Sequence, residues 1–363
     1  MPLRLRHLCA AVAAILAAAL LSPVTPATAA TADRFGFAYV DDPTALPWTP
    51  LPAAYQYGSW TPGLTATGGK VALGRFQVRF PNIGLGGRGN AHVTAVARDG
   101  RFCELVRWYG SGPDQIVDVQ CFRPGGRPAD TPFTVLWTFS SGVLPAGVGA
   151  YASAQVTSNL LAQAYNSAGA PVSASHVGVG IYAVRFSGVG EPSGILSGNV
   201  QVTAQQPNAE PRRCKILRWG ASGPEVLVYV ACHDPFSGAP MDSDFTVSFH
   251  RERSVYASFG PPRYFGYLAT PPFAGPTNYS YPLGIGPNGY APTGPGTSVV
   301  RFPLLHERHT TAHVTAIGDS PSYCTIQELW AQVATTAVLP VTCFANNGRL
   351  LDSQYSSTFS SSV

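Results

Sequence analysis

The sequence predicts an all-β protein of three tandem modules, each a small β-sandwich or barrel-like unit with one cross-strand disulfide. Three observations lead to this prediction. One pattern of residues recurs at intervals of about 110 residues. Apolar and polar residues alternate with a period of two inside each copy, which is typical of strands. Six of the seven cysteines fall into pairs, one pair in each copy.

The repeated pattern is plainest in the middle copy, where the stretch NVQVTA is followed by Cys214, Trp219, Cys232, Gly238 and Asp242. The corresponding residues of the other copies are Cys103, Trp108, Cys121, Gly126 and Asp130, then Cys324, Trp330, Cys343, Gly348 and Asp352. We expect modules over residues 30–142, 143–254 and 255–363. Because a unit of this size can bury a core of its own, we expect three beads on a string.

The N-terminus has the features of a secretory signal peptide over residues 1–29. Arg4 and Arg6 precede an apolar run from Leu8 to Leu21, and the small-residue site Ala27-Thr28-Ala29 follows. The apolar run is shorter than the roughly 20 residues that a spanning helix needs. We therefore expect a secreted, extracellular protein with no integral membrane segment.

The composition excludes some classes of partner. Loss of the two leader arginines lowers the formal charge from +4 to +2, which predicts no nucleic-acid partner. Gly (38) and Pro (33) are abundant and charged residues make up 12%, which favours strands and turns over helices. Only Ala150 to Tyr165 approaches a helical period. The only lysines are Lys70 and Lys215, a bias that we attribute to a GC-rich genome.

The cysteine spacing predicts three disulfides within modules: Cys103–Cys121, Cys214–Cys232 and Cys324–Cys343. The first two pairs are symmetric about Gly-Pro sequences at Gly112 and Gly223. A tight hairpin there would place each pair on opposite strands with Cα atoms roughly 4.5 Å apart. These cysteines form no C-x-x-C pair, and a lone His233 after Cys232 does not complete the ligand set of a zinc site.

Strand patterns fill each module. The stretches at Gly74–Phe80, Gly180–Phe186 and Gly296–Phe302 alternate apolar and polar residues. We count six or seven strand-like runs per copy, enough for a sandwich. By parity, Trp108 and Trp219 should lie on the opposite strand face from the preceding cysteine. The longer spacing before Trp330 predicts a one-residue bulge.

The segment Ser254 to Ser298 is rich in Pro and Tyr and has two interpretations. It could form an extended contact surface, because Tyr offers a large contact area with a polar tip. We favour the alternative that it supplies the first strands of the third module. FGYLAT and NYSYPLG fall where FAYVDD and YQYGSW fall in the first.

Histidines give no convincing metal or catalytic motif. The cluster His306-Glu307-Arg308-His309 with His313 does not fit H-E-x-x-H spacing, and it leads into a strand, where residues four apart lie too far apart for one ion. His92 and His313 occupy one repeated position, where the second copy has Gln201. We interpret that position as polar and facing solvent.

Candidate binding residues are the repeated tryptophans and their arginine neighbours: Trp108, Trp219, Trp330, Arg107 and Arg218. An exposed Trp beside an Arg could stack on a sugar or form a cation–π pair. Buried tryptophan is the interpretation we favour, because Val and Ile alternate on the partner strand.

Asp130, Asp242 and Asp352 precede the last strand of each copy, and we expect them to hold turn amides rather than a metal. No nucleophile motif, phosphate-binding glycine loop or carboxylate pair is present, and no cofactor is indicated.

The pattern G-x-[FY]-x-V-x-F, V-T-A, C-x4-W, V-x-V-x-C-[FH] and G-x3-D-x2-[FY] resembles repeats in uncharacterised secreted proteins of actinobacteria. More loosely it is similar to small β-sandwich modules at the tips of bacterial and phage fibres. The resemblance spans all three copies and implies no particular activity. The third copy departs most, with Ser298 and Tyr355 in place of an aromatic and a Phe.

Three functions remain open. The favoured one is a non-enzymatic extracellular protein that binds a glycan or protein or serves as a structural component of the cell exterior. A secreted hydrolase would use loop residues, with His306, Glu307 and His309 as candidates. A protease inhibitor would present the segment Ser254 to Ser298.

Overall fold

The computed structural model describes residues 33–145, 147–256, 264–272, 275–305 and 308–362. The expected signal peptide lies outside the described residues. From Ala32 to Val363 the chain forms one compact unit. Within the described ranges the helices are two short 3-10 segments, η1 (Ala53–Tyr55) and η2 (Gly275–Thr277). No described helix has the length and apolarity needed to cross a bilayer.

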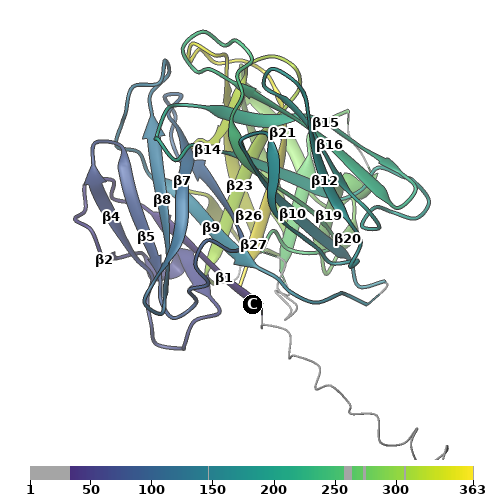
Figure 1. The fold of residues 1–363 in the computed structure, drawn as a ribbon, viewed down its shortest axis with the longest axis horizontal. Helices are drawn as coiled ribbons and strands as arrows, with labels where there is room; N and C mark the ends of the chain where they lie inside the picture. Colours follow the sequence, from purple (N-terminus) through teal and green to yellow (C-terminus); the bar gives the residue numbers. More distant parts are fainter. Residues whose placement is uncertain (1–32, 146, 257–263, 273–274, 306–307, 363) are drawn as a thin grey trace, which may run out of the picture. The chain divides into compact units, whose positions relative to one another are not determined.

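The protein is all-β, and its strands fall into three groups that follow the three sequence copies (Figure 1). Module 1 contains β1 (Arg34–Val40), β2 (Thr49–Pro50), β3 (Gln56–Gly58), β4 (Thr67–Ala72), β5 (Arg75–Phe80), β6 (Asn90–Ala95), β7 (Phe102–Ser111), β8 (Asp114–Phe122) and β9 (Phe133–Phe139). Module 2 contains β10 (Ala150–Thr157), β11 (Leu160–Asn166), β12 (Val172–Gly178), β13 (Ile181–Phe186), β14 (Asn199–Gln205), β15 (Arg213–Ser222), β16 (Glu225–His233) and β17 (Asp244–Arg251). Module 3 contains β18 (Phe265–Ala269), β19 (Asn278–Tyr281), β20 (Gly284–Ile285), β21 (Gly289–Gly294), β22 (Thr297–Pro303), β23 (Thr310–Ile317), β24 (Tyr323–Ile326), β25 (Ala331–Val333), β26 (Thr336–Phe344) and β27 (Gln354–Ser361).

Each module is a two-layer sandwich. In module 1 the sheet β3-β1-β9-β6 packs on β7-β8-β5-β4-β2, and modules 2 and 3 repeat this order with their own strands. The period of two explains the layers: in β5, Phe76, Val78 and Phe80 are fully buried, while the residues between them are not. Each module therefore has its own apolar core.

The three predicted disulfides are confirmed. Cys103 faces Cys121, Cys214 faces Cys232 and Cys324 faces Cys343 in antiparallel register, with Cα atoms 4.0 Å apart in each pair. In module 1 the hairpin closes with a two-residue turn after Ser111. Gly112 begins that turn with φ of 57°, a conformation that favours glycine.

The predicted strand faces of two tryptophans were wrong, because a bulge precedes each of them. The register shifts between Leu105 and Arg107 and, in module 2, between Ile216 and Arg218. The extra residue moves Trp108 onto the core side that Cys103 also contacts. In module 3 the strand is instead interrupted, and Trp330 lies between β24 and β25.

Two uncertain segments are strands. Ala150 to Tyr165, the stretch nearest to a helical period, forms β10 and β11. In the segment Ser254 to Ser298, β18 pairs with β19 and β27 as β1 pairs with β3 and β9, so the favoured interpretation is confirmed for its described part. Residues 257–263 and 273–274 lie outside the description.

We had expected three modules joined only by linkers, like beads on a string. This expectation was wrong, because neighbouring modules share hydrogen bonds at all three junctions. Gln206 donates its amide to the carbonyl of Leu105, Gly318 to Ile216, and Ala97 to Ile326, at 2.8 to 2.9 Å. These bonds join modules 2 and 1, 3 and 2, and 1 and 3. The chain thus closes into a ring of modules around a pseudo-three-fold axis.

Candidate functional site

The V-T-A sequence of each copy forms the centre of this ring. Strands β6, β14 and β23 bring Thr94, Thr203 and Thr315 together at the axis. Each threonine side-chain oxygen accepts the valine amide of a neighbouring module: Val93 to Thr203 at 3.4 Å, Val202 to Thr315 at 3.1 Å and Val314 to Thr94 at 3.3 Å. The recurring tripeptide is therefore a junction between modules.

The repeated position of His92, Gln201 and His313 does not face solvent, contrary to our interpretation. All three side chains are 1% exposed. Each contacts the threonine of the next module: His92 Nδ1 lies 3.1 Å from Thr203, His313 Nδ1 3.3 Å from Thr94, and Gln201 Oε1 accepts from Thr315 at 2.9 Å. The polar face of the strand is buried between modules. Polar residues are needed there because their side chains form hydrogen bonds with the neighbouring module.

A third histidine, His250, completes a buried neutral cluster. Burial lowers the pKa of His92 and of His250 to about 3 and lowers the pKa of His313 well below its usual value. Neither ring nitrogen of His250 has a hydrogen-bond partner among the described residues. The axial core therefore holds uncharged imidazoles at neutral pH.

Above the threonines lies an axial cavity of about 60 Å³, lined by equivalent residues of all three modules. The position before the first cysteine of each module contributes Phe102, Arg213 and Tyr323. The guanidinium carbon of Arg213 lies 4.0 Å from the ring centre of Tyr323 and 5.1 Å from that of Phe102. Lys215 and His233 also line the cavity.

The candidate tryptophans are buried, as favoured, and their rings form no exposed stacking platform. Trp108, Trp219 and Trp330 are 3 to 5% exposed. The indole of Trp108 donates to the carbonyls of Gly87 and Arg88, and that of Trp330 donates to Thr310. In modules 1 and 3 these side chains hold the loop that enters the axial strand.

The arginines beside the tryptophans are exposed but engaged. Arg107 lies over the ring of Tyr109 and pairs with the buried carboxylate of Asp118 at 3.1 Å. Arg218 lies over the ring of Tyr229. Arg107 and Arg218 are exposed while Trp108 and Trp219 are buried, so these residues form no exposed Trp–Arg stacking surface.

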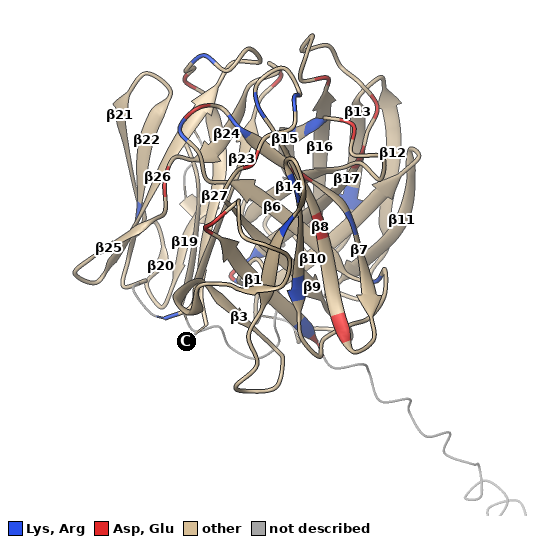
Figure 2. Cartoon of the chain, turned by 90° about the vertical axis from the view of Figure 1, so that its left-hand side faces the viewer, with Lys and Arg blue, Asp and Glu red and all other residues tan. Residues whose placement is uncertain are grey.

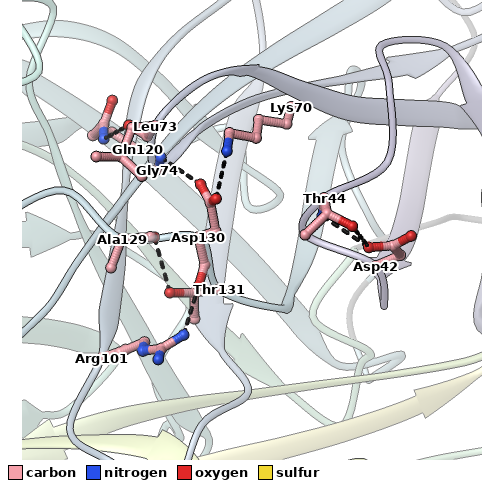
Figure 3. A network of polar contacts seen from close by, with 10 residues as sticks. All are labelled: Asp42, Thr44, Lys70, Leu73, Gly74, Arg101, Gln120, Ala129, Asp130 and Thr131. Carbon is pink, nitrogen blue, oxygen red and sulfur yellow. Dashed lines mark hydrogen bonds and ion pairs between the residues drawn. The ribbon is translucent and has the colours of Figure 1, made fainter.

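The three repeated aspartates hold turn amides, as predicted. Asp130 accepts the amide of Gly74 at 2.8 Å and pairs with Lys70 at 2.5 Å (Figure 3). Asp242 accepts from Gly180 and Asp352 from Gly296, both at 2.6 Å. Each glycine has φ of 66 to 69°. These aspartates therefore close the hairpin before the second strand of the outer sheet, and among the described residues no cluster of metal ligands is found.

A first cleft of about 280 Å³ lies between modules 1 and 2. Its lining includes Arg88 and Asn90 from the approach to β6, and Gln163 and Tyr165 from edge strand β11. Gln163 accepts the amide of Gly89 at 3.1 Å and fixes one wall. The exposed guanidinium of Arg88 lies over the ring of Phe139, 4.6 Å from its centre, and the cleft also offers amides and the half-buried ring of Tyr165.

A second cleft of about 470 Å³ lies between modules 3 and 1. Arg308 and His309, which precede β23, form one wall, and η1 with its last residue Tyr55 forms another. His309 stacks on Tyr57 with ring centres 5.4 Å apart and bonds Ser362 at 3.0 Å. The other proposed hydrolase residues, His306 and Glu307, lie outside the described residues.

Charged residues are spread thinly along the strands and loops of the described chain (Figure 2). Among the buried ionisable side chains, Asp114 and Asp118 lie on β8 and pair with arginines, while Glu104, Arg213 and Lys215, which are 0 to 7% exposed, lie near the axis. Sequence reasoning missed these residues and the two clefts. A signal was present, since one of the two lysines follows Cys214 at a position occupied by Glu104 and Thr325 in the other copies.

No family model, curated protein or solved structure matches the chain. Fold and site geometry alone define its class, an all-β protein of three disulfide-containing sandwich modules closed into a ring.

Proposed function

We propose that the protein is a secreted, non-enzymatic β-repeat protein that binds an extracellular glycan or protein through the clefts between its modules. Three disulfides support an oxidising location outside the cytoplasm. We further propose kinship with the secreted actinobacterial repeat proteins that the motifs resemble.

The observation that carries the proposal is that two clefts occur at corresponding junctions of the ring. Both lie between the loop that precedes an axial strand and the edge of the next module. Each is lined by an exposed arginine, Arg88 or Arg308, and by a half-buried tyrosine, Tyr165 or Tyr55. An aromatic face with nearby hydrogen-bond donors is a common arrangement for binding sugars and peptides.

The rigid ring explains how such clefts could hold a ligand. Disulfides, threonine bonds and backbone pairing fix both walls, so little conformational freedom is lost on binding. At the third junction Gly198 donates its amide to the carbonyl of Pro276 at 3.0 Å. The loop before β14 thus contacts module 3 directly.

The test compares retention on glycan arrays and surface-protein panels for the wild type, Arg88→Ala, Arg308→Ala and the double variant. Arg88 and Arg308 are exposed, so folding should be preserved. We expect at least about tenfold weaker binding in the double variant. Arg218→Ala serves as control and also tests the surface suggested by the sequence. Wild-type retention by the double variant, or no retention of any ligand by the wild type, would refute the proposal.

A further inference from the structure

Module 2 places an arginine, a lysine and a neutral histidine at the axis, where its neighbours place no basic residue. Arg213, Lys215 and His233 occupy the positions of Phe102, Glu104 and Phe122 in module 1, and of Tyr323, Thr325 and Phe344 in module 3. Arg213 and Lys215 are two residues apart on β15, so both project from the same face of the strand. All three line the axial cavity.

These cations are deeply buried and lack a paired carboxylate. Arg213 is 7% and Lys215 3% exposed. Among the described residues, no carboxylate oxygen lies within ion-pair distance of either side chain. A buried charge without a counterion costs several kcal/mol, so an unpaired arrangement of this kind requires explanation.

Nearby acids do not supply the missing charge. Asp234 attracts Arg213 electrostatically from beyond ion-pair distance, but its oxygens already accept hydrogen bonds from Phe236 and Ser237. Asp319 attracts Lys215 electrostatically, but its carboxylate is exposed to solvent. Glu104 does not line the cavity, and burial raises its pKa, which favours the neutral acid.

The cavity also has unused donors. Arg213 Nε and Nη1 are buried and have no hydrogen-bond partner among the described residues, while Nη2 donates to Asn346. Lys215 donates to Ser320 and Ser322, both at 2.9 Å, which leaves one of its three protons. Thr94, Thr203 and Thr315 line the same space. A volume of about 60 Å³ admits a few waters or one small ion.

We propose that the axial cavity binds one small inorganic anion, such as chloride or phosphate, beside Arg213 and Lys215. The anion neutralises the two cations and accepts the unused N–H groups. Burial, with a smaller contribution from repulsion by Arg213, lowers the pKa of Lys215 to about 7, and a bound anion raises it. The site links all three modules, so its occupancy stabilises the ring.

The test begins with wild-type protein dialysed into a buffer whose anions are too large for the cavity. Sodium chloride and sodium phosphate are then titrated separately, with heat of binding and melting temperature recorded. We expect a saturable response with a stoichiometry near one for at least one anion, which identifies it. A melting temperature that changes only linearly with salt, with no binding heat, would overturn the proposal because general salt effects behave in that way.

Variants locate the site. Arg213→Gln and Lys215→Met should weaken anion binding by at least about tenfold. Arg218→Gln is the matched control, an exposed arginine on the same strand, and should leave binding unchanged. Equal binding by folded Arg213→Gln and Lys215→Met proteins would place the anion elsewhere and overturn the proposal. If neither variant folds, the wild-type titration still decides it.

Discussion

The amide of Val202 donates a hydrogen bond to the side-chain oxygen of Thr315, at 3.1 Å, across the junction of modules 2 and 3. The same bond recurs at the other two junctions. Each threonine is at most 6% exposed, so water cannot readily replace it as acceptor. The ring thus depends on a side chain that the sequence repeats in every copy.

Replacing Thr315 by Val should destabilise the protein by about 2 to 3 kcal/mol. The isosteric valine leaves the Val202 amide without its acceptor and Gln201 Oε1 without its donor. Urea unfolding measures the loss. Thr65→Val, at an exposed position, is the control and should stay within about 0.5 kcal/mol of wild type. Equal midpoints for the two variants would contradict a role for the threonine ring.

Removing the second disulfide by Cys214→Ala with Cys232→Ala should cost about 3 kcal/mol, because the bridge closes a loop across 18 residues of sequence separation. Since module 2 shares hydrogen bonds with both neighbours, we expect one cooperative transition rather than early melting of a single module. Differential scanning calorimetry distinguishes the two outcomes. A separate low-temperature peak would support independent beads.

Gly74→Ala should destabilise module 1 more than Gly112→Ala. Both glycines have positive φ, 67° and 57°, so both variants pay about 1 kcal/mol or more of backbone strain. At Gly74 an added Cβ would also lie 2.6 Å from the carbonyl oxygen of Cys121, whereas at Gly112 it meets nothing within 4 Å. The difference in unfolding free energy isolates the clash, and equal losses would show that the hairpin shifts freely.

Local features could be predicted from the sequence. The hairpin at Gly112 and the opposition of Cys103 and Cys121 could be predicted, but the two-residue turn alone would pair Cys103 with Phe122, and the bulge before Arg107 restores the pairing with Cys121. The turn role of Asp130 follows from its type and place. The bulge before Arg107 left no signal, since Leu105 and Val106 are both fully buried apolar residues.

The arrangement around the axis could not be predicted in the same way. The alternation of polar and apolar residues shows that His92 and Val93 point to opposite faces of β6. It does not show what covers the polar face. Solvent and a polar junction both select polar side chains. The usable signal was the constancy of Val-Thr-Ala in three copies that otherwise differ, since a solvated threonine tolerates replacement.

His250→Phe should make stability less dependent on pH. Burial depresses the pKa of folded His250 to about 3, below the ordinary value of 6.5, so the unfolded chain binds a proton first as pH falls. The stability due to the neutral imidazole is full above pH 6.5 and declines toward the folded pKa. At pH 5, protonation of this histidine in the unfolded chain lowers the free energy of unfolding by about 2 kcal/mol.

Phenylalanine suits the site because His250 lacks described hydrogen-bond partners and meets the ring of Tyr267 edge-on, with centres 5.4 Å apart. We therefore expect near wild-type stability at pH 7.5 and a smaller loss between pH 7.5 and 5, measured by urea unfolding at both values. The comparison with wild type cancels the opposite contribution of Glu104, whose raised pKa favours folding as pH falls. Parallel pH profiles for the two proteins would mean that His250 is reached by water in the folded state.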